Sequence, residues 1–492
     1  MNIKTAATSS HSVGRQLMLI DGRRVASSSG REIEVLDPAT GEIIAAAPEA
    51  SAADIDLAVA AASRAFRQGP WKDFTAAARA RILWRAAELL EKNAEMLTRL
   101  EALNSGMLLS LAGNMVAYAA ETLRYYAGYA TKIEGKTVNL SGDQRNIHAY
   151  TLKSPIGVCG FIVPWNAPIT LTCLKIAPAL AAGCTCVVKP AEETPLTALK
   201  LAELLSEAGL PDGVVNVVTG YGDSAGAALA RHGGVRKLAF TGSTEVGKLI
   251  VQAATDNLKK VTLELGGKSP TIVFDDADMD RAIPGAAAAI FTNSGQICFA
   301  GSRLYVQRGS FDRVVTSMAA LAKAMKIGSP FHPTTQIGPL ISAKQLERVT
   351  DLIASGLSDG AELIVGGRTV GDAGYFVEPT ILANPAPGSR VVREEIFGPV
   401  LSAIPFDDVD EVMQMANDSE YGLAATVWTR DINKAHRTAQ RFESGCVWIN
   451  CAFVNDPAMP GGGYKQSGWG REGGKEGLDA YLETKKVFAL LT

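Results

Sequence analysis

The chain has 492 residues, of which 47% are hydrophobic and 20% charged, and its formal net charge is −3. This composition is typical of a globular protein, and the length exceeds what one hydrophobic core supports, so two or three domains are expected. The near-balance of 48 basic and 51 acidic side chains gives no cationic excess, so neither nucleic acid nor a membrane is an expected partner.

The cysteines and the N-terminal residues exclude several further classes of protein. The seven cysteines are odd in number and irregularly spaced, which argues against a disulfide framework. Cys184 and Cys186 are too close for a metal pair of the usual spacing, and we expect no metal site. Residues 1–16 carry neither the apolar segment nor the Arg-rich face of a targeting signal, and no run of eighteen apolar residues occurs. A cytoplasmic protein is expected.

The N-terminal third predicts short strands followed by helices. Two turns between strands are expected first: Asp21-Gly22, inside a hairpin over 17–25, and Asp37–Gly41. From residue 52 to 130 apolar residues recur at helical spacing. Residues 131–155 lose that period and predict a strand pair, Val138–Leu140 with Ile147–Leu152. We interpret this pair as an arm that leaves one domain before the next strand begins.

Residues 156–264 alternate apolar runs with helical segments. The expected strands are Ile156–Val163, Thr185–Val188, Val214–Val218, Lys237–Phe240 and Val261–Glu264, and the expected helices are Leu171–Ala182, Leu196–Ala208 and Ser243–Thr255. Near-continuous apolar strands that alternate with helices predict a parallel sheet covered on both faces. Ligands of such sheets bind at the carboxyl ends of the strands.

A second α/β pattern follows, to about residue 460. Its expected elements are the strands Pro270–Phe274, Ser302–Gln307 and Ala424–Trp428, the helices 278–290 and 310–325, and the turn Val365–Arg368. The chain ends in the apolar segment Val487–Leu491. Because an exposed apolar terminal strand promotes aggregation, we expect it to pair with another strand, in this subunit or in a neighbouring one.

A single thiol, Cys298, lies among small and turn-forming residues. Asn293, Ser294 and Gly295 precede it, and Ala300 and Gly301 follow. Such residues let the backbone approach the sulfur closely and leave room for a substrate. The thiol would be a nucleophile if held as thiolate or given a base. The alternative is an inert buried cysteine, since free Cys is often a small core residue.

Two segments predict contacts with a nucleotide. Phe240–Leu249 follows an apolar strand and opens a helix, where free N–H groups favour an anion. It is not a P-loop, because Leu249 replaces the hydroxyl residue that binds magnesium, and it lacks the usual dinucleotide glycine pattern. Lys189 and Glu192 follow another strand, where a carboxylate can bind ribose hydroxyls and repel a 2′-phosphate. The alternatives are an ordinary helix start and a solvated charge pair.

Other polar groups at strand ends are candidates for catalysis. Glu264 ends an apolar strand before two glycines, and burial there would raise its pKa toward that of a general base. Asn166 sits in a proline-framed turn, where a fixed amide could stabilise an oxyanion. The segment Glu394–Pro399 offers carboxylates beside an aromatic ring. The alternative for Glu264 is a strand-end carboxylate with no catalytic role.

Taken together, these segments resemble the NAD(P)-dependent aldehyde dehydrogenase superfamily over nearly the whole chain. The matching segments are Pro164–Asn166, Lys189–Pro195, Phe240–Gly247, Leu263–Pro270, Gly295–Cys298, Glu394–Pro399 and Gly463–Gly468. The resemblance implies an α/β fold with a Rossmann-like cofactor domain (1–132 and 156–264), an α/β catalytic domain (265–467) and a small β oligomerisation arm (133–155 and 468–492). It also implies a homodimer or homotetramer.

The resemblance implies a role for each matching residue. Cys298 attacks the aldehyde to form a thiohemiacetal and then a thioester, Asn166 and the Cys298 N–H hold the oxyanion, and Glu264 activates water. Lys175 and Glu472 match a proton relay. The implied cofactor residues are Ile162, Pro164, Trp165, Lys189, Glu192, Gly222, Phe240, Gly242, Ser243, Val246, Leu265, Glu395 and Phe397. Glu264 favours the hydrolytic branch over the CoA-acylating one, and Glu192 favours NAD, with NADP possible.

The implied substrate pocket is apolar. By the resemblance it is lined by Ala167, Cys173, Leu174, Phe291, Ile297, Phe299, Phe453 and Val454. This set has no cation, whereas a semialdehyde carboxylate would need one. We therefore expect an uncharged hydrophobic aldehyde, such as phenylacetaldehyde. The family often has Pro-Phe-Gly-Gly where this chain has Pro460–Gly463, and the lost aromatic could loosen the loop or make space.

Three rival interpretations remain from the sequence. One is a semialdehyde or betaine-aldehyde dehydrogenase with the same chemistry. Another is a P-loop nucleotide-binding protein, which Leu249 disfavours. The third is a non-catalytic family member with a structural role, which would not need the intact set of Cys298, Glu264 and Asn166.

Overall fold

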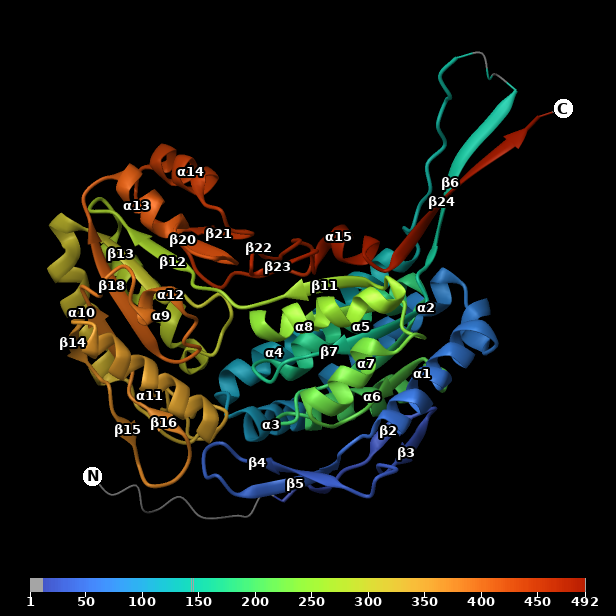
Figure 1. Ribbon diagram of the computed structural model, residues 1–492, viewed down its shortest axis with the longest axis horizontal. Coiled ribbons are helices and arrows are strands. Elements are labelled where there is room, and N and C mark those ends of the chain that lie inside the picture. Colours follow the sequence, from blue (N-terminus) through green and yellow to red (C-terminus); the bar gives the residue numbers. More distant parts are fainter. Residues whose placement is uncertain (1–11, 143, 145, 492) are drawn as a thin grey trace.

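The computed structural model describes residues 12–142, 144 and 146–491, and contains two large sheets and a projecting two-stranded arm (Figure 1). The first sheet has the strand order β23-β11-β10-β7-β8-β9-β2-β3. Its strands are β2 (Met18–Ile20), β3 (Arg23–Val25), β7 (Val158–Ile162), β8 (Thr185–Lys189), β9 (Val215–Val217), β10 (Lys237–Thr241), β11 (Lys260–Glu264) and β23 (Gly468–Trp469). The five strands β7 to β11 are parallel, as the sequence predicts.

Helices cover both faces of this sheet. They are α1 (Ala52–Arg67), α2 (Ala76–Lys92), α3 (Ala94–Ser105), α4 (Leu109–Ala130), α5 (Pro168–Ala182), α6 (Leu196–Glu207), α7 (Ala227–Arg231), α8 (Thr244–Ala254) and α15 (Gly474–Asp479). In β7, Cys159 and Phe161 pack in one hydrophobic cluster, and Val158 and Ile162 pack in the cluster on the other face. Burial of both faces explains why the strands are continuously apolar.

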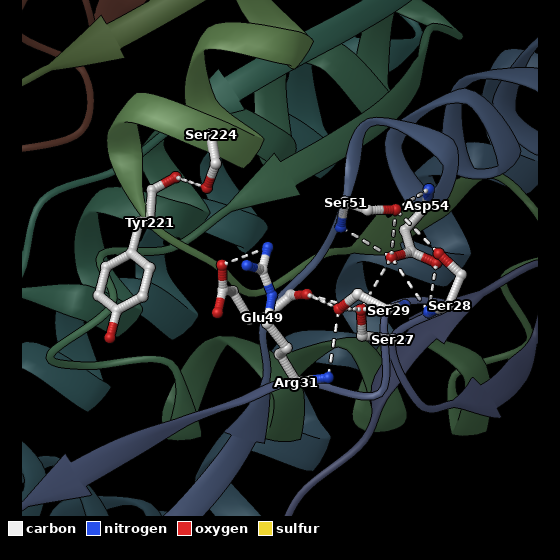
Figure 2. Close-up of polar contacts among 9 residues, drawn as sticks. All are labelled: Ser27, Ser28, Ser29, Arg31, Glu49, Ser51, Asp54, Tyr221 and Ser224. Carbon is white, nitrogen blue, oxygen red and sulfur yellow. Dashed lines mark hydrogen bonds and ion pairs between the residues drawn. The ribbon is translucent and has the colours of Figure 1, made fainter.

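A polar cluster fixes the start of α1 beside the end of β9 (Figure 2). Ser51 and Asp54 form a capping box, and Asp54 also accepts a hydrogen bond from the Ser28 N–H at 3.0 Å. The Ala50 N–H donates to the Thr219 carbonyl at 2.9 Å, so this cluster adjoins the loop that continues to Tyr221. The segment that precedes α1 is therefore anchored next to a ligand-side loop of the sheet.

The second sheet has the order β14-β17-β18-β13-β12-β20-β21 and is parallel except at β14. Its strands are β12 (Pro270–Val273), β13 (Arg303–Gln307), β14 (Glu362–Val365), β17 (Thr380–Ala383), β18 (Val400–Phe406), β20 (Ala424–Trp428) and β21 (Cys446–Ile449). Its helices are α9 (Met279–Phe291), α10 (Phe311–Ala324), α11 (Ala343–Ser358), α12 (Arg390–Arg393), α13 (Val409–Asn417) and α14 (Ile432–Arg441). The strands and helices predicted in this half are confirmed to within one or two residues.

Smaller sheets complete the structure. A three-stranded sheet contains β1 (Gly14–Arg15), β4 (Glu32–Leu36) and β5 (Ile43–Pro48), and two-stranded sheets join β15 (Thr369–Val370) to β16 (Phe376–Val377) and β19 (Tyr421–Gly422) to β22 (Tyr464–Lys465). Both predicted N-terminal turns are confirmed.

In the part of the chain that the structure describes, no helix has the length and apolarity needed to cross a membrane.

The arm pairs β6 (Ile147–Pro155) with β24 (Leu482–Leu490) in an antiparallel ribbon that extends away from both sheets (Figure 1). The predicted partner strand Val138–Leu140 is wrong, because only an isolated bridge joins Thr137 to Tyr150. The C-terminal strand provides nine paired residues, whereas the predicted segment offers two apolar side chains around Asn139. The expectation that the apolar C-terminal segment pairs with another strand is confirmed.

Candidate active site

Cys298 lies in a tight loop between α9 and β13. Asn293, Ser294 and Gly295 all have positive φ, of 52°, 54° and 73°. The Ser294 hydroxyl donates to the Gly338 carbonyl at 2.8 Å, and the Gln296 side-chain oxygen accepts from the Ile341 N–H at 2.9 Å. Left-handed conformations at non-glycine residues are rare and gather at functional sites, so the loop geometry supports the predicted special role of its thiol.

The Cys298 thiol sits in a polarised environment. Burial, together with the carboxyl groups of Glu395 and Glu264, raises the thiol pKa, while the backbone N–H groups of Cys298 and Phe299 lower it. A raised pKa favours the protonated thiol, and a cationic group beside it would lower the pKa again. These N–H groups could also stabilise the oxyanion of a carbonyl carbon bonded to the sulfur.

Asn166 reaches the Cys298 loop from the other sheet. It follows β7, and its side-chain amide donates to the Gln296 carbonyl at 3.0 Å. Asn293 donates back to the Asn166 carbonyl at 3.3 Å. The structure thus brings together the predicted oxyanion donor and the predicted nucleophile loop, which are far apart in sequence.

Glu264, at the carboxyl end of β11, adjoins a buried charge network. The Lys175 ammonium forms an ion pair with Glu472 and donates to the Thr241 hydroxyl at 2.7 Å. Burial, together with the Glu472 charge, raises the pKa of Glu264 well above its usual value, whereas Lys175 and Arg471 lower it. The Glu264 Oε1 atom is buried and has no hydrogen-bond partner among the described residues. An unpaired, protonatable oxygen is what a general base requires.

The unusual glycine segment 461–463 lies against this carboxyl group. A Cβ atom on Gly462 would stand 2.9 Å from Glu264 Oε1, so the absence of a side chain there makes room for the carboxyl. A Cβ atom on Gly461 would meet no atom within 4 Å. The aromatic residue common at this position in the family would therefore occupy open space here.

Glu395 and the aromatic residue two positions later form one end of the predicted cofactor site. The Glu395 carboxyl accepts from the Gly267 N–H at 2.9 Å, and burial raises its pKa to about 7. Phe397 has a φ of 59° and contacts Trp165 edge to face, with ring centroids 5.2 Å apart. The structure thus gathers these three predicted cofactor residues at one place.

The predicted ribose and phosphate residues lie at strand ends of the first sheet. The Lys189 ammonium is buried and donates to the Pro190 and Gly220 carbonyls, each at 2.7 Å, and to Glu192 at 3.3 Å. Ser243 caps α8 by accepting from the Val246 N–H. The other predicted cofactor residues follow the same strands: Ile162 and Pro164 at β7, Gly222 after β9, Phe240 and Gly242 at β10, and Leu265 at β11.

Aromatic side chains surround the predicted substrate side of Cys298. The Phe299 ring lies 5.5 Å from the Trp448 ring and 5.4 Å from the Phe453 ring, between centroids. Ala167, Leu174 and Ile297 are partly exposed, and Val454 is exposed. Phe291 and Cys173 are buried in the two cores, so neither side chain offers a surface to a substrate.

Three residues of the site escape sequence reasoning. Thr241 binds Lys175, Gln296 anchors the Cys298 loop, and Trp448 extends the aromatic cluster. Gln296 could be suspected from its position beside the thiol, but nothing local distinguishes Thr241 or Trp448. A separate hollow of about 730 Å³, lined by Arg99 and Leu196 among others, contains none of the predicted catalytic side chains.

Comparisons with known proteins identify the family of this chain. Residues 25–487 match the model of the aldehyde dehydrogenase family. Human retinal dehydrogenase 2 is 48% identical over 464 residues (94% of this chain and 89% of that protein), and Arabidopsis thaliana aldehyde dehydrogenase family 2 member C4 is 46% identical over 472 residues (96% and 94%).

Solved structures extend the similarity to the whole fold. An NAD⁺ complex of aldehyde dehydrogenase from Bacillus cereus matches with a TM-score of 0.95 at 45% identity, covering 97% of each chain. A Staphylococcus aureus betaine aldehyde dehydrogenase in complex with NAD⁺ also matches at 0.95, with 37% identity and coverage of 97% and 95%. By sequence and by structure, this chain belongs to the aldehyde dehydrogenase family.

Proposed function

We propose that the protein oxidises an uncharged hydrophobic aldehyde, of which phenylacetaldehyde is a representative, to its carboxylic acid with NAD. The observation that carries this proposal is the cluster of Phe299, Trp448 and Phe453 directly beside Cys298. Aromatic rings bind flat apolar groups by offset or edge contacts. The predicted lining residues include no cation that would pair with the carboxylate of a semialdehyde.

The chain's own residues account for the chemistry. The Cys298 thiol loses its proton to solvent and its sulfur bonds to the aldehyde carbon. The oxygen that gains negative charge is stabilised by the Asn166 amide and the Cys298 N–H. Loss of hydride from this carbon leaves a thioester on the sulfur. Glu264 then removes a proton from water, the hydroxide attacks the thioester carbon, and the C–S bond breaks to release the acid and return the thiol.

The described residues fit a nicotinamide dinucleotide, which supplies the hydride acceptor when bound. Val246 is an exposed apolar residue in the first turn of α8, and Glu192 presents a partly exposed carboxylate. The Lys189 ammonium is occupied by two carbonyls and by Glu192, so it is not free to pair with a 2′-phosphate. These features support NAD over NADP. Glu395 would hold the nicotinamide ribose and Phe397 and Trp165 would pack near the ring.

Betaine aldehyde is a second candidate substrate. A ring of aromatic faces also attracts a quaternary ammonium group through cation–π interactions, and a betaine aldehyde dehydrogenase is among the structural relatives. The two candidates make opposite predictions about charge, so a substrate panel separates them.

The test follows NADH absorbance with phenylacetaldehyde, a long aliphatic aldehyde, betaine aldehyde and succinate semialdehyde. We expect the highest kcat/KM with phenylacetaldehyde or the aliphatic aldehyde. In Phe453→Ala, these two substrates should lose more kcat/KM than succinate semialdehyde does. A strong preference for the semialdehyde would refute the proposal, and a preference for betaine aldehyde would establish the second candidate.

We also propose that the arm joins subunits into a dimer or tetramer. The proposed compartment is the cytoplasm, and the proposed domain boundaries are those inferred from the sequence. Leu152, Phe488 and Leu490 on the arm are each about half exposed in the single chain. Such apolar side chains favour association. Light scattering of the wild type and of a chain shortened after residue 481 tests this, because loss of β24 should yield monomers.

A further inference from the structure

The two helices that follow the predicted oxyanion and ribose segments lack their own caps. Helix α5 begins two residues after Asn166, and α6 begins four residues after Glu192. Neither Ala167 nor Pro195, at the N-cap positions, makes a side-chain hydrogen bond to its helix. The first N–H groups of both helices therefore need acceptors from elsewhere.

Helix α3 supplies those acceptors. The fully buried Glu101 carboxylate accepts from the Ile169 N–H of α5 at 3.1 Å and from the Thr197 hydroxyl of α6 at 2.6 Å. One turn later, the Asn104 side-chain oxygen accepts from the Leu196 N–H at 3.3 Å, and its amide donates to the Glu193 carbonyl at 2.7 Å. Glu101 thus touches both helices, whereas Asn104 touches only the second.

Retaining a charge at Glu101 costs stability. Burial raises its pKa to about 7, and the hydrogen bonds from Thr197 and Ile169 only partly offset this. The titratable group that faces it is the buried Cys173 thiol of α5, whose own pKa is raised by burial and by Glu101. The pKa of Glu101 is higher in the folded protein than in the unfolded chain. The protein therefore loses folding stability as the pH rises from the unfolded-chain pKa through 7. Above pH 7, a neutral glutamine at this position would give the more stable protein.

We propose that Glu101 is a positioning residue: its carboxylate holds the first turns of α5 and α6 together, and so sets the Asn166 segment relative to the Lys189–Glu192 segment. The functional part of this inference rests on the proposed function, because those segments act on the oxyanion and on the cofactor ribose. A helix N-terminus interacts more strongly with an anion than with a neutral acceptor, which explains the retained charge.

The test compares Glu101→Gln with Asn104→Ala. In Glu101→Gln we expect, at pH 8, about a fivefold rise in KM for NAD and about a fivefold fall in kcat, since a charged acceptor is replaced by a neutral one. Its melting temperature should be equal to or above that of the wild type.

Asn104→Ala should raise the KM for NAD and leave kcat within about twofold, because Asn104 makes hydrogen bonds to the α6 segment alone. Below pH 7 the KM for NAD should rise more in the wild type than in Glu101→Gln, because Glu395 titrates in both proteins and Glu101 only in the wild type.

Hydrogen exchange gives a readout that does not depend on activity. Peptides covering 164–171 and 192–199 should both exchange faster in Glu101→Gln, and only the second should do so in Asn104→Ala. Wild-type exchange in both segments, or a lower melting temperature with unchanged KM and kcat, would overturn the proposal and leave Glu101 an ordinary structural residue. An inactive wild type would instead refute the proposed function, and the exchange experiment would still decide the role of Glu101.

Discussion

The proposed nucleophile, Cys298, and the proposed base, Glu264, are held in different ways. The Cys298 loop is fixed by neutral hydrogen bonds and by residues with positive φ, such as Ser294. Glu264 is surrounded by charges, above all the Lys175–Glu472 ion pair. Neutral hydrogen bonds do not change with pH, whereas a charge network does. The difference indicates that the geometry of the Cys298 loop is insensitive to pH, whereas the ionisation of the Cys298 thiol and of Glu264 carries the pH dependence.

The largest effect is expected at the nucleophile. Cys298→Ser should lower kcat/KM by at least about 10⁴-fold, since no other side chain can form the thioester. The NAD dissociation constant, measured by fluorescence titration, should stay near the wild-type value because the loop keeps its hydrogen bonds. Residual turnover above a hundredth of the wild-type rate would contradict the assignment of this thiol.

Changing the base should separate the two halves of the reaction. Glu264→Gln should lower steady-state turnover by about 10²- to 10⁴-fold, while a first burst of NADH of one equivalent per site persists. Stopped-flow absorbance measures both quantities. Loss of the burst together with turnover would mean that Glu264 is needed to activate the thiol as well.

Breaking the ion pair should combine a loss of stability with a pH shift. Lys175→Met leaves the partly buried Glu472 carboxylate without its partner, which we expect to cost about 3 kcal/mol of unfolding free energy. Because Lys175 lowers the pKa of Glu264, its removal should move the rising limb of the pH–kcat profile to higher pH. Lys259→Met is the matched control: Lys259 is a buried lysine that donates to the Ala230 and His232 carbonyls, and its loss should lower stability without moving the profile.

The smallest effect is expected at the glycine segment. Gly462→Ala should lower kcat by about tenfold, because its Cβ would stand 2.7 Å from the Gly470 carbonyl oxygen and 2.9 Å from Glu264 Oε1, so both the backbone of the segment and the carboxyl must shift. Gly461→Ala is the control and should change kcat by less than about twofold, since its Cβ meets open space. Equal effects of the two substitutions would show that the segment acts through its flexibility.

The sequence predicts the sheets well because each apolar strand is bounded by glycine or a turn. The Leu171–Ala182 helix ends at Gly183, which has a φ of 94°, and the Cys298 loop contains the turn residues that its left-handed conformations require. These are local signals, and local signals can be recognised without knowing the fold.

Long-range contacts could not be predicted in this way. Lys175 and Glu472 are 297 residues apart, and only the resemblance to a family suggested that they act together. Glu101 is hidden within a helical pattern, and its partners lie on two other helices. The predicted strand Val138–Leu140 failed for the same reason, because the strand that pairs along the whole of β6 is the distant end of the chain.

The pairing of β6 with β24 has a consequence for synthesis on the ribosome. β6 is complete at residue 155, but its partner begins at residue 482. At about 5–20 residues per second, β6 waits roughly 15–65 s before β24 is made. Strand β23 and Glu472 also belong to the last segment. A chain released before residue 472 would lack both β24 and Glu472, so it should be inactive, whereas one released between residues 472 and 481 would lose β24 alone.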